Sequence, residues 1–170
     1  MVILITGASH TGKTVLAKKL VERHGFACLS IDLLKMGLIR SGNTSLTPED
    51  DEELEAYLWP IVREIMKTAI ENEQDLIVEG CYVPLDWRKD FTDDYAGAIR
   101  FCCLAMSERY IEEHFDDIKA HASDVERRLD DEWCTKELLL EENERIIELC
   151  RKHGEACILI DERYEVDLEL

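Results

Sequence analysis

The sequence predicts an α/β fold in which helices cover both faces of one parallel sheet. Short apolar runs rich in Ile, Val, Leu and Cys alternate with amphipathic segments along the chain. These runs show little of the alternation of a half-exposed sheet, which indicates strands that are buried on both sides. Five runs are predicted strands: residues 2–6, 26–31, 75–79, 98–104 and 156–160.

Four segments with apolar positions three to four residues apart are predicted helices. They cover residues 13–24, 47–70, 107–121 and 136–153. Gly25 follows the first of them, where a left-handed C-cap is favoured. In the second, Thr47 is expected to cap the helix, with Pro48 at the first helical position and Asp50 closing the capping box. Pro60 lies inside that helix and removes a backbone hydrogen bond, so a kink or break is expected there.

The size and charge of the chain limit its class and its partners. Its 170 residues suit one domain, and its formal net charge is −18. Such an acidic chain is a poor partner for nucleic acid, because duplex binding depends on Lys and Arg contacts to phosphate. A nucleotide is still an acceptable ligand, since salt screens distant carboxylates over about 8 Å. No apolar run approaches the roughly 20 residues of a membrane span. We expect a single domain over residues 1–170 that binds neither nucleic acid nor a membrane.

The cysteines and the N-terminal residues predict a cytoplasmic protein. The seven cysteines include no CxxC pair and no His/Cys cluster at zinc-ligand spacing. An odd number of cysteines, several of them inside strand-like runs, suits reduced and buried thiols. The first residues lack the charged start of a signal peptide and run directly into a glycine loop. No metal site built from the cysteines is expected.

Residues 7–14, GASHTGKT, join the first predicted strand to the first predicted helix. The pattern Gly-x4-Gly-Lys-Thr in this context is typical of a phosphate-binding (Walker A) loop. Its glycines let the backbone wrap phosphate oxygens, and the helix N-terminus adds positive potential. The predicted nucleotide-binding residues are Gly7, Ala8, Ser9, His10, Thr11, Gly12, Lys13 and Thr14.

The last two residues of this loop carry the expected chemistry. Lys13 is expected to reach the β- and γ-phosphates of a nucleoside triphosphate, and Thr14 is expected to ligate Mg²⁺. The Asn-Lys-x-Asp string by which GTPase switch proteins recognise guanine does not occur. Motor and transporter ATPases normally need a longer chain. The remaining large class transfers a phosphoryl group from ATP to a small acceptor.

Three stretches, in this order, resemble the P-loop small-molecule kinases: ILITGASHTGKTVLAKKL, CLSIDLLKMGLIR and DLIVEGCYVP. That group includes the nucleoside monophosphate kinases, such as adenylate kinase, and relatives like shikimate, chloramphenicol and 2-phosphoglycerate kinases. The resemblance implies a three-layer P-loop NTPase fold, whose five-stranded parallel sheet has the order 2-3-1-4-5 and is flanked by helices. It also implies an acceptor-binding region at residues 32–60 and a lid at residues 121–135.

On the acceptor side, the resemblance makes Asp32, at the end of the second predicted strand, a base or hydrogen-bond acceptor for the attacking oxygen. Positioning of that oxygen supplies much of the rate of phosphoryl transfer. The alternative is that Asp32 only caps the following segment, LLKMGLIR. Lys35 and Arg40 lie on that segment and are candidates to hold an anionic acceptor group. Monophosphate kinases usually have an arginine near the position of Lys35, so this lysine departs from their pattern.

The end of the third predicted strand supplies the next candidates. Glu79 is expected to orient Mg²⁺ through water or to bind the acceptor, with a simple strand end as the alternative. Gly80 is expected to leave room for the substrate. Tyr82, Pro84 and Trp87 follow as candidate walls of the acceptor pocket, with packing in the core as an equal alternative.

A lid is expected to supply an arginine, because negative charge develops on the transferred phosphoryl group. Arg127 and Arg128 lie in the polar segment ASDVERRLDDEW and are the candidates. The alternative is that both pair with nearby aspartates on an exposed helix. Asp161 and Arg163, just beyond the last predicted strand, fall where such kinases often contact the adenine of ATP.

The sequence therefore predicts a kinase that transfers the γ-phosphoryl group of Mg-ATP to a small-molecule acceptor. A nucleoside monophosphate kinase of the adenylate type is the alternative among enzymes. An ATP-binding regulatory module with weak ATPase activity is the alternative from another class. A monomer is the default expectation for such a small kinase, with a homodimer as the alternative. The sequence does not identify the acceptor.

Overall fold

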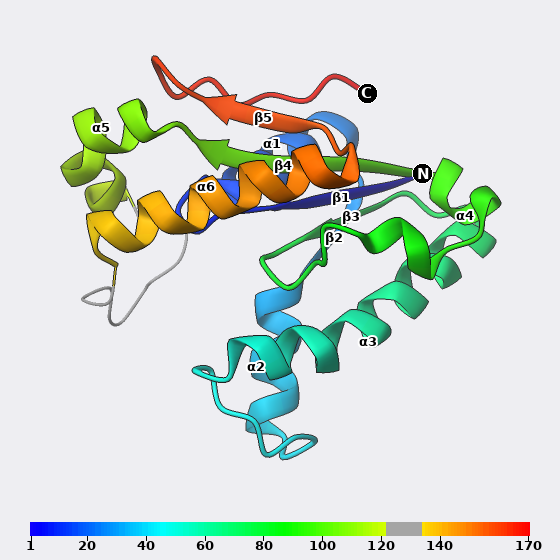
Figure 1. Cartoon of the computed structure of the whole chain (residues 1–170). Coiled ribbons are helices and arrows are strands. Elements are labelled where there is room, and N and C mark those ends of the chain that lie inside the picture. Colours follow the sequence, from blue (N-terminus) through cyan, green and yellow to red (C-terminus); the bar gives the residue numbers. More distant parts are fainter. Residues whose placement is uncertain (122–133) are drawn as a thin grey trace.

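The computed structural model describes residues 1–121 and 134–170 and contains a five-stranded parallel sheet (Figure 1). The strands lie in the expected order β2-β3-β1-β4-β5. Their ends differ from the predicted runs by at most two residues. They are β1 (Val2–Gly7), β2 (Ala27–Ser30), β3 (Leu76–Glu79), β4 (Ile99–Met106) and β5 (Cys157–Ile160).

The helices connect these strands as crossovers. Two of them, α1 and α6, begin and end at the predicted residues, and left-handed C-caps at Gly25 and Gly154 end them, with φ of 73° and 69°. A short 3-10 turn that was not predicted, Trp87–Asp90, lies between β3 and the helix that follows it. The helices are α1 (Lys13–His24), α2 (Ile31–Arg40), α3 (Asp51–Glu71), α4 (Asp93–Gly97), α5 (Glu108–His121) and α6 (Lys136–His153).

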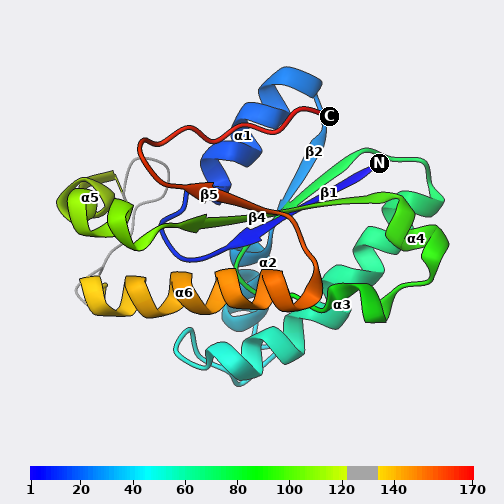
Figure 2. The same ribbon diagram turned by 45° about the horizontal axis from the view of Figure 1, so that its top comes forward.

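Two hydrophobic cores lie on opposite faces of the sheet (Figure 2). Alternate residues of β1 point into them, Leu4 into the core under α3 and α6, and Ile3 and Ile5 into the core under α1 and α5. The central strand is therefore buried on both sides, as predicted. The edge strand β2 is an exception, because Ala27 and Cys28 are exposed.

The start of α3 differs from the prediction. The helix begins at Asp51 rather than just after Thr47, and Asp50 is its N-cap. The Asp50 carboxylate accepts hydrogen bonds from the amide and the hydroxyl of Thr47, over 2.7 and 2.9 Å. The threonine hydroxyl therefore acts as a donor in a turn and does not cap the helix.

A kink or break was expected near Ala56–Pro60, and the break does not occur, because α3 continues through Pro60 to Glu71. Pro60 and Ala56, whose carbonyl loses its helical partner, are both exposed. Water can hydrogen-bond that carbonyl, so the lost bond falls on the face where it costs least. A departure from helical angles occurs instead in α5, at His114. None of the helices in the described ranges is long and apolar enough to cross a membrane.

A backbone contact between β1 and β4 fixes the point at which the chain leaves the sheet. The Ala8 amide donates to the Leu104 carbonyl over 3.1 Å. Gly7 has a φ of 134°, and a Cβ there would stand 2.0 Å from the same carbonyl oxygen. Only glycine permits this approach, because the atom it would strike belongs to the backbone of a central strand.

We expect Gly7→Ala to lower the free energy of unfolding by about 3 kcal/mol or more, through backbone strain and the displacement of β4. Urea denaturation measures the change. Gly37→Ala is the matched control, since Gly37 lies inside α2 with nothing within 4 Å of an added Cβ. That variant should gain roughly 0.5–1 kcal/mol. Equal effects of the two substitutions would contradict the steric explanation.

Candidate functional site

The candidate site lies at the carboxyl ends of β1 and β3, the edge where ligands bind in parallel α/β sheets. β1 ends at Gly7 and continues into the loop that leads to α1, and β3 ends at Glu79. Ile5 and Glu79 are register partners in the sheet. The fold therefore brings the predicted phosphate-binding loop next to the predicted acidic residue.

Local interactions fix the shape of this loop. His10 and Gly12 have left-handed backbone angles, with φ of 62° and 81°. The Thr11 hydroxyl donates to the Ala8 carbonyl over 2.7 Å. Gly12 is the N-cap of α1 and has no side chain with which to accept hydrogen bonds from the first-turn amides, and that turn has no acidic residue. The positive end of α1 is thus suited to an anionic ligand.

Lys13 lies over the loop and is 8% exposed. Its Nζ donates to the carbonyls of Gly7 and Ala8 over 3.1 and 2.8 Å. Burial opposes the charged form, but the Cys81 thiol and the carboxylates of Glu142 and Asp32 together raise the pKa of Lys13. A permanent positive charge is therefore held at the end of the central strand.

Thr14 and Glu79 form a direct contact, in which the Thr14 hydroxyl donates to Glu79 Oε2 over 3.1 Å. Glu79 is 3% exposed, and burial raises its pKa although the bond from Thr14 and the charge of Lys13 act in the opposite direction. A hydroxyl and a carboxylate side by side are oxygen ligands of the kind that Mg²⁺ prefers. These two residues fit the predicted magnesium site.

Glu142 of α6 also reaches the loop, and the sequence analysis missed it. Its Oε1 accepts hydrogen bonds from the amide and the hydroxyl of Ser9, over 3.0 and 3.1 Å. The two residues are 133 positions apart. Glu142 lies in a run of acidic residues on an amphipathic helix, so no local pattern marks it.

On the acceptor side, Asp32 lies in the first turn of α2 rather than at the end of β2, because that strand stops at Ser30. Lys35 donates to Asp32 over 2.9 Å and to the Tyr82 hydroxyl over 3.0 Å. Tyr82 in turn donates to Asp51 over 2.8 Å. Burial opposes the charge of Lys35, but Tyr82 and Asp32 raise its pKa well above the ordinary value. The predicted Asp32, Lys35 and Tyr82 therefore meet in one network, to which Asp51 is an unpredicted addition.

Three other predicted site residues, Arg40, Gly80 and Trp87, do not belong to this network. Arg40 is exposed at the far end of α2, eight residues and so about 12 Å along the axis from Asp32. A Cβ on Gly80 would stand 2.7 Å from Cβ of Ile31, so close packing of α2 against β3 accounts for this glycine. Trp87 is fully buried and stacks on Phe101 with ring centres 5.7 Å apart. Trp87 is thus a packing residue.

The segment after β5 approaches the loop through a residue that was not predicted. The Tyr164 hydroxyl donates to the Thr11 carbonyl over 3.3 Å and lies beside Gly12. Arg163 is exposed and pairs with Glu165 over 2.9 Å. Asp161 is partly buried directly after β5. The two predicted lid arginines, Arg127 and Arg128, lie outside the described residues.

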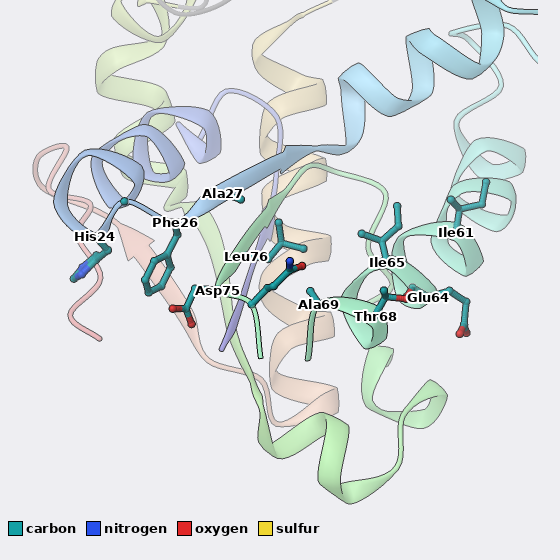
Figure 3. A pocket seen from close by; sticks show the side chains of 12 residues that line it. His24, Phe26, Ala27, Ile61, Glu64, Ile65, Thr68, Ala69, Asp75 and Leu76 are labelled. Atoms are coloured by element: carbon teal, nitrogen blue, oxygen red, sulfur yellow. The ribbon is translucent and has the colours of Figure 1, made fainter. Parts of the chain in front are cut away.

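A groove of about 850 Å³ lies elsewhere, at the amino ends of β2 and β3 (Figure 3). Phe26, Ile65 and Leu76 line it, together with the polar side chains of Glu64 and Asp75. Parallel sheets bind ligands at the opposite, carboxyl edge. None of the predicted site residues in the described part of the chain lines this groove.

No family model and no curated protein matches the sequence of this chain. Solved structures do match its fold. A protein from Chloroflexus aurantiacus, provisionally described as a kinase, has a TM-score of 0.60 and 19% identity over 98% of this chain and 91% of its own.

Two further structures have kinase names. Deoxyadenosine kinase from M. mycoides, solved with dCMP and dCDP, has a TM-score of 0.57 and 13% identity over 98% of this chain and 92% of its own. A gluconokinase from Sinorhizobium meliloti has a TM-score of 0.50 and 16% identity over 94% of this chain and 81% of its own. The fold is therefore that of the P-loop small-molecule kinases, as the sequence resemblance implied.

We expect Glu79→Gln to raise the free energy of unfolding of the ligand-free protein at pH 7. Burial raises the pKa of Glu79 above its ordinary 4.5. The ionised carboxylate therefore costs stability, and the cost appears as the pH rises through the raised pKa. The advantage of the glutamine should shrink as the pH falls toward 4.5. Urea denaturation at several pH values measures it.

Glu64→Gln is a control for which we expect the opposite change in the free energy of unfolding. Hydrogen bonds from Lys67 and Arg63 lower the pKa of this exposed carboxyl. Removing its charge should slightly destabilise the protein at pH 7. If Glu79→Gln also destabilised the protein at pH 7, the ionised carboxylate of Glu79 would not be unfavourable in the native state.

Proposed function

We propose that the protein is an ATP-dependent kinase that transfers the γ-phosphoryl group of Mg-ATP to a hydroxyl group of a small molecule. The proposal rests on one observation. Lys13, Asp32 and the contacting pair Thr14–Glu79 lie together at the carboxyl edge of the sheet. Phosphoryl transfer needs these elements together: a cation at the phosphates, oxygen ligands for a metal and a carboxylate for the acceptor. The kinase names of the structures with this fold support the same chemistry.

On the ATP side, residues 7–14 bind the triphosphate through backbone amides and the positive end of α1. Lys13 neutralises charge on the β- and γ-phosphates, which requires its Nζ to turn from the loop carbonyls toward the nucleotide. Thr14 and Glu79 would hold Mg²⁺, directly or through water, and the metal would reduce the negative charge of the phosphates. Asp161 and Arg163 are proposed contacts of the adenine, with Tyr164 as a third.

On the acceptor side, Asp32 accepts the proton of the attacking hydroxyl and aligns its oxygen with the γ-phosphorus. Lys35 holds Asp32 in place through the 2.9 Å ion pair. Tyr82 and Gly80 border the same space. Arg127 or Arg128 stabilises the charge that develops on the transferred group, as a lid closes and excludes water.

The charges of the acceptor region favour a neutral or cationic acceptor. Lys35 is already engaged by Asp32 and Tyr82, so it has little capacity left for an anion. Arg40 lies at the far end of α2. The carboxylates of Asp32 and Asp51 are close by, and they repel a phosphate or carboxylate on the acceptor. We infer a hydroxyl compound such as a sugar, a nucleoside or an amino alcohol, which argues against a nucleoside monophosphate as acceptor.

Lys13→Ala should reduce ATP turnover at saturating acceptor by at least about 100-fold, because it removes the cation that stabilises the transferred phosphoryl group. A coupled assay of ADP release measures this. Lys18→Ala, which removes an exposed lysine five residues further along α1, is the control and should keep full activity. If the protein bound ATP but no acceptor from a broad panel raised the rate of ADP release, the regulatory module would be favoured instead.

Asp32→Asn should lower kcat by roughly 10²- to 10⁴-fold, because it removes the base and leaves the ATP side intact. The affinity for Mg-ATP, measured by calorimetry, should change little. The same panel tests the acceptor class, with each neutral hydroxyl compound set against its phosphorylated form. Faster turnover of a nucleoside monophosphate than of any neutral compound would overturn the acceptor assignment and favour the adenylate-like alternative.

A further inference from the structure

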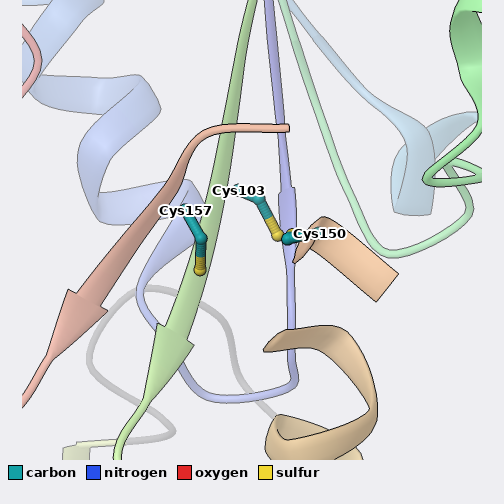
Figure 4. A group of neighbouring side chains, drawn as sticks. All are labelled: Cys103, Cys150 and Cys157. Atoms are coloured by element: carbon teal, nitrogen blue, oxygen red, sulfur yellow. The ribbon is translucent and has the colours of Figure 1, made fainter. Parts of the chain in front are cut away.

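Three cysteines meet outside the candidate site, on the α6 side of the sheet (Figure 4). Cys103 lies on β4, Cys150 on α6 and Cys157 at the start of β5. Their Sγ atoms all lie within 4.8 Å of one another. We call these three residues the thiol cluster. Cys103 and Cys157 are register partners of adjacent strands, so the sheet itself fixes part of the spacing.

We propose that the thiol cluster binds one soft metal ion of the Cu(I) class. Thiolates are the ligands that such ions prefer. A metal–sulfur bond of about 2.3 Å places the three sulfurs of a trigonal site about 4 Å apart. The observed sulfurs, which lie within 4.8 Å of one another, are already close to that spacing.

The number of ligands favours a three-coordinate ion over zinc. Within residues 1–121 and 134–170, the potential ligand group consists of the three thiols alone. Structural zinc sites are closed by four ligands. Glu155 is the carboxylate whose charge acts on Cys150, but both of its oxygens are bound by Arg88, over 2.6 and 3.3 Å. It is therefore engaged elsewhere, and the site suits an ion that is satisfied by three sulfurs.

Cu(I) is bound by thiolates rather than by thiols. Binding of Cu⁺ therefore displaces the three thiol protons of Cys103, Cys150 and Cys157 into solvent. The product is a copper trithiolate with a charge of −2, and Arg151 is the nearby counter-charge.

Burial leaves one route to the cluster. Cys103 and Cys150 are 0% and 2% exposed, whereas Cys157 is partly exposed. Ala156, next to Cys157 in the connection from α6 to β5, is exposed. An ion or a thiol reagent therefore reaches Cys157 first, and the apolar core then excludes water from the other two sulfurs.

Titration of the reduced full-length protein with Cu(I), in competition with a chromogenic Cu(I) chelator, tests the proposal. It is done without oxygen, because oxidation would pair two of the thiols as a disulfide and remove the site. We expect one copper per chain, with three sulfur neighbours at about 2.3 Å by X-ray absorption. Zn²⁺ in the same assay should bind more weakly.

Two variants separate the cluster from other cysteines. Cys157→Ser should weaken Cu(I) binding by more than about 100-fold, since it removes a ligand outright. Cys102→Ser is the control. Cys102 is buried like its neighbour Cys103, but its side chain points into the opposite core. It should bind Cu(I) as the unmodified protein does. Circular dichroism and urea denaturation of both variants report whether they fold.

A measurement on the unmodified protein needs no variant. Cu(I) should suppress alkylation of Cys157 and leave the exposed Cys28 reactive, as mass spectrometry of the modified peptides can show. Protection of Cys28 in place of Cys157, unchanged copper affinity in Cys157→Ser, or tighter binding of zinc than of copper would each overturn the proposal. The result does not depend on the kinase activity, which the acceptor assays test separately.

Discussion

The contact of Gly7 and Ala8 with Leu104 is the constraint on which the candidate site depends. It holds the end of β1 against β4, so the chain must leave the sheet at one point and in one direction. The loop carbonyls that follow are then placed to accept from Lys13 Nζ, and the turn at Gly12 begins α1. A packed sheet thus fixes the position of a flexible cationic side chain, which a loop without this anchor would leave variable.

Charged groups that the proposed chemistry needs lower the stability of the ligand-free protein. A chain with a net charge of −18 buries one lysine among the acidic side chains of Asp32, Glu79 and Glu142. Cys81, Glu142 and Asp32 raise the pKa of Lys13, but burial makes the ionised form of Glu79 unfavourable. Such a conflict is consistent with the proposal that the site binds phosphate and Mg²⁺, since those ligands would supply the charges that balance it.

Helix α6 links the two sites described above. Glu142 contacts the phosphate-binding loop, and its neighbour Asn143 accepts from the buried Met106 amide over 2.7 Å, which fastens the helix to the end of β4. Two turns further along, Cys150 belongs to the thiol cluster. Helix α6 is one rigid element that carries Glu142, Asn143 and Cys150. A metal ion bound to the thiol cluster would connect α6 to β4 and β5, and it would thereby also hold Glu142 in its position beside Ser9.

The sequence by itself determined the strands of the sheet and the helices α1 and α6. Apolar runs, helical periodicity and glycine caps are signals from adjacent residues, and they fixed the bounds of these elements to within two positions. It failed where two local signals competed, as at Thr47, whose hydroxyl donates to Asp50 instead of capping α3. Only the tertiary structure brought Glu142 to the loop and the three cysteines together. Contacts between residues far apart in the chain depend on how helices pack on the sheet, and no local spacing encodes that packing.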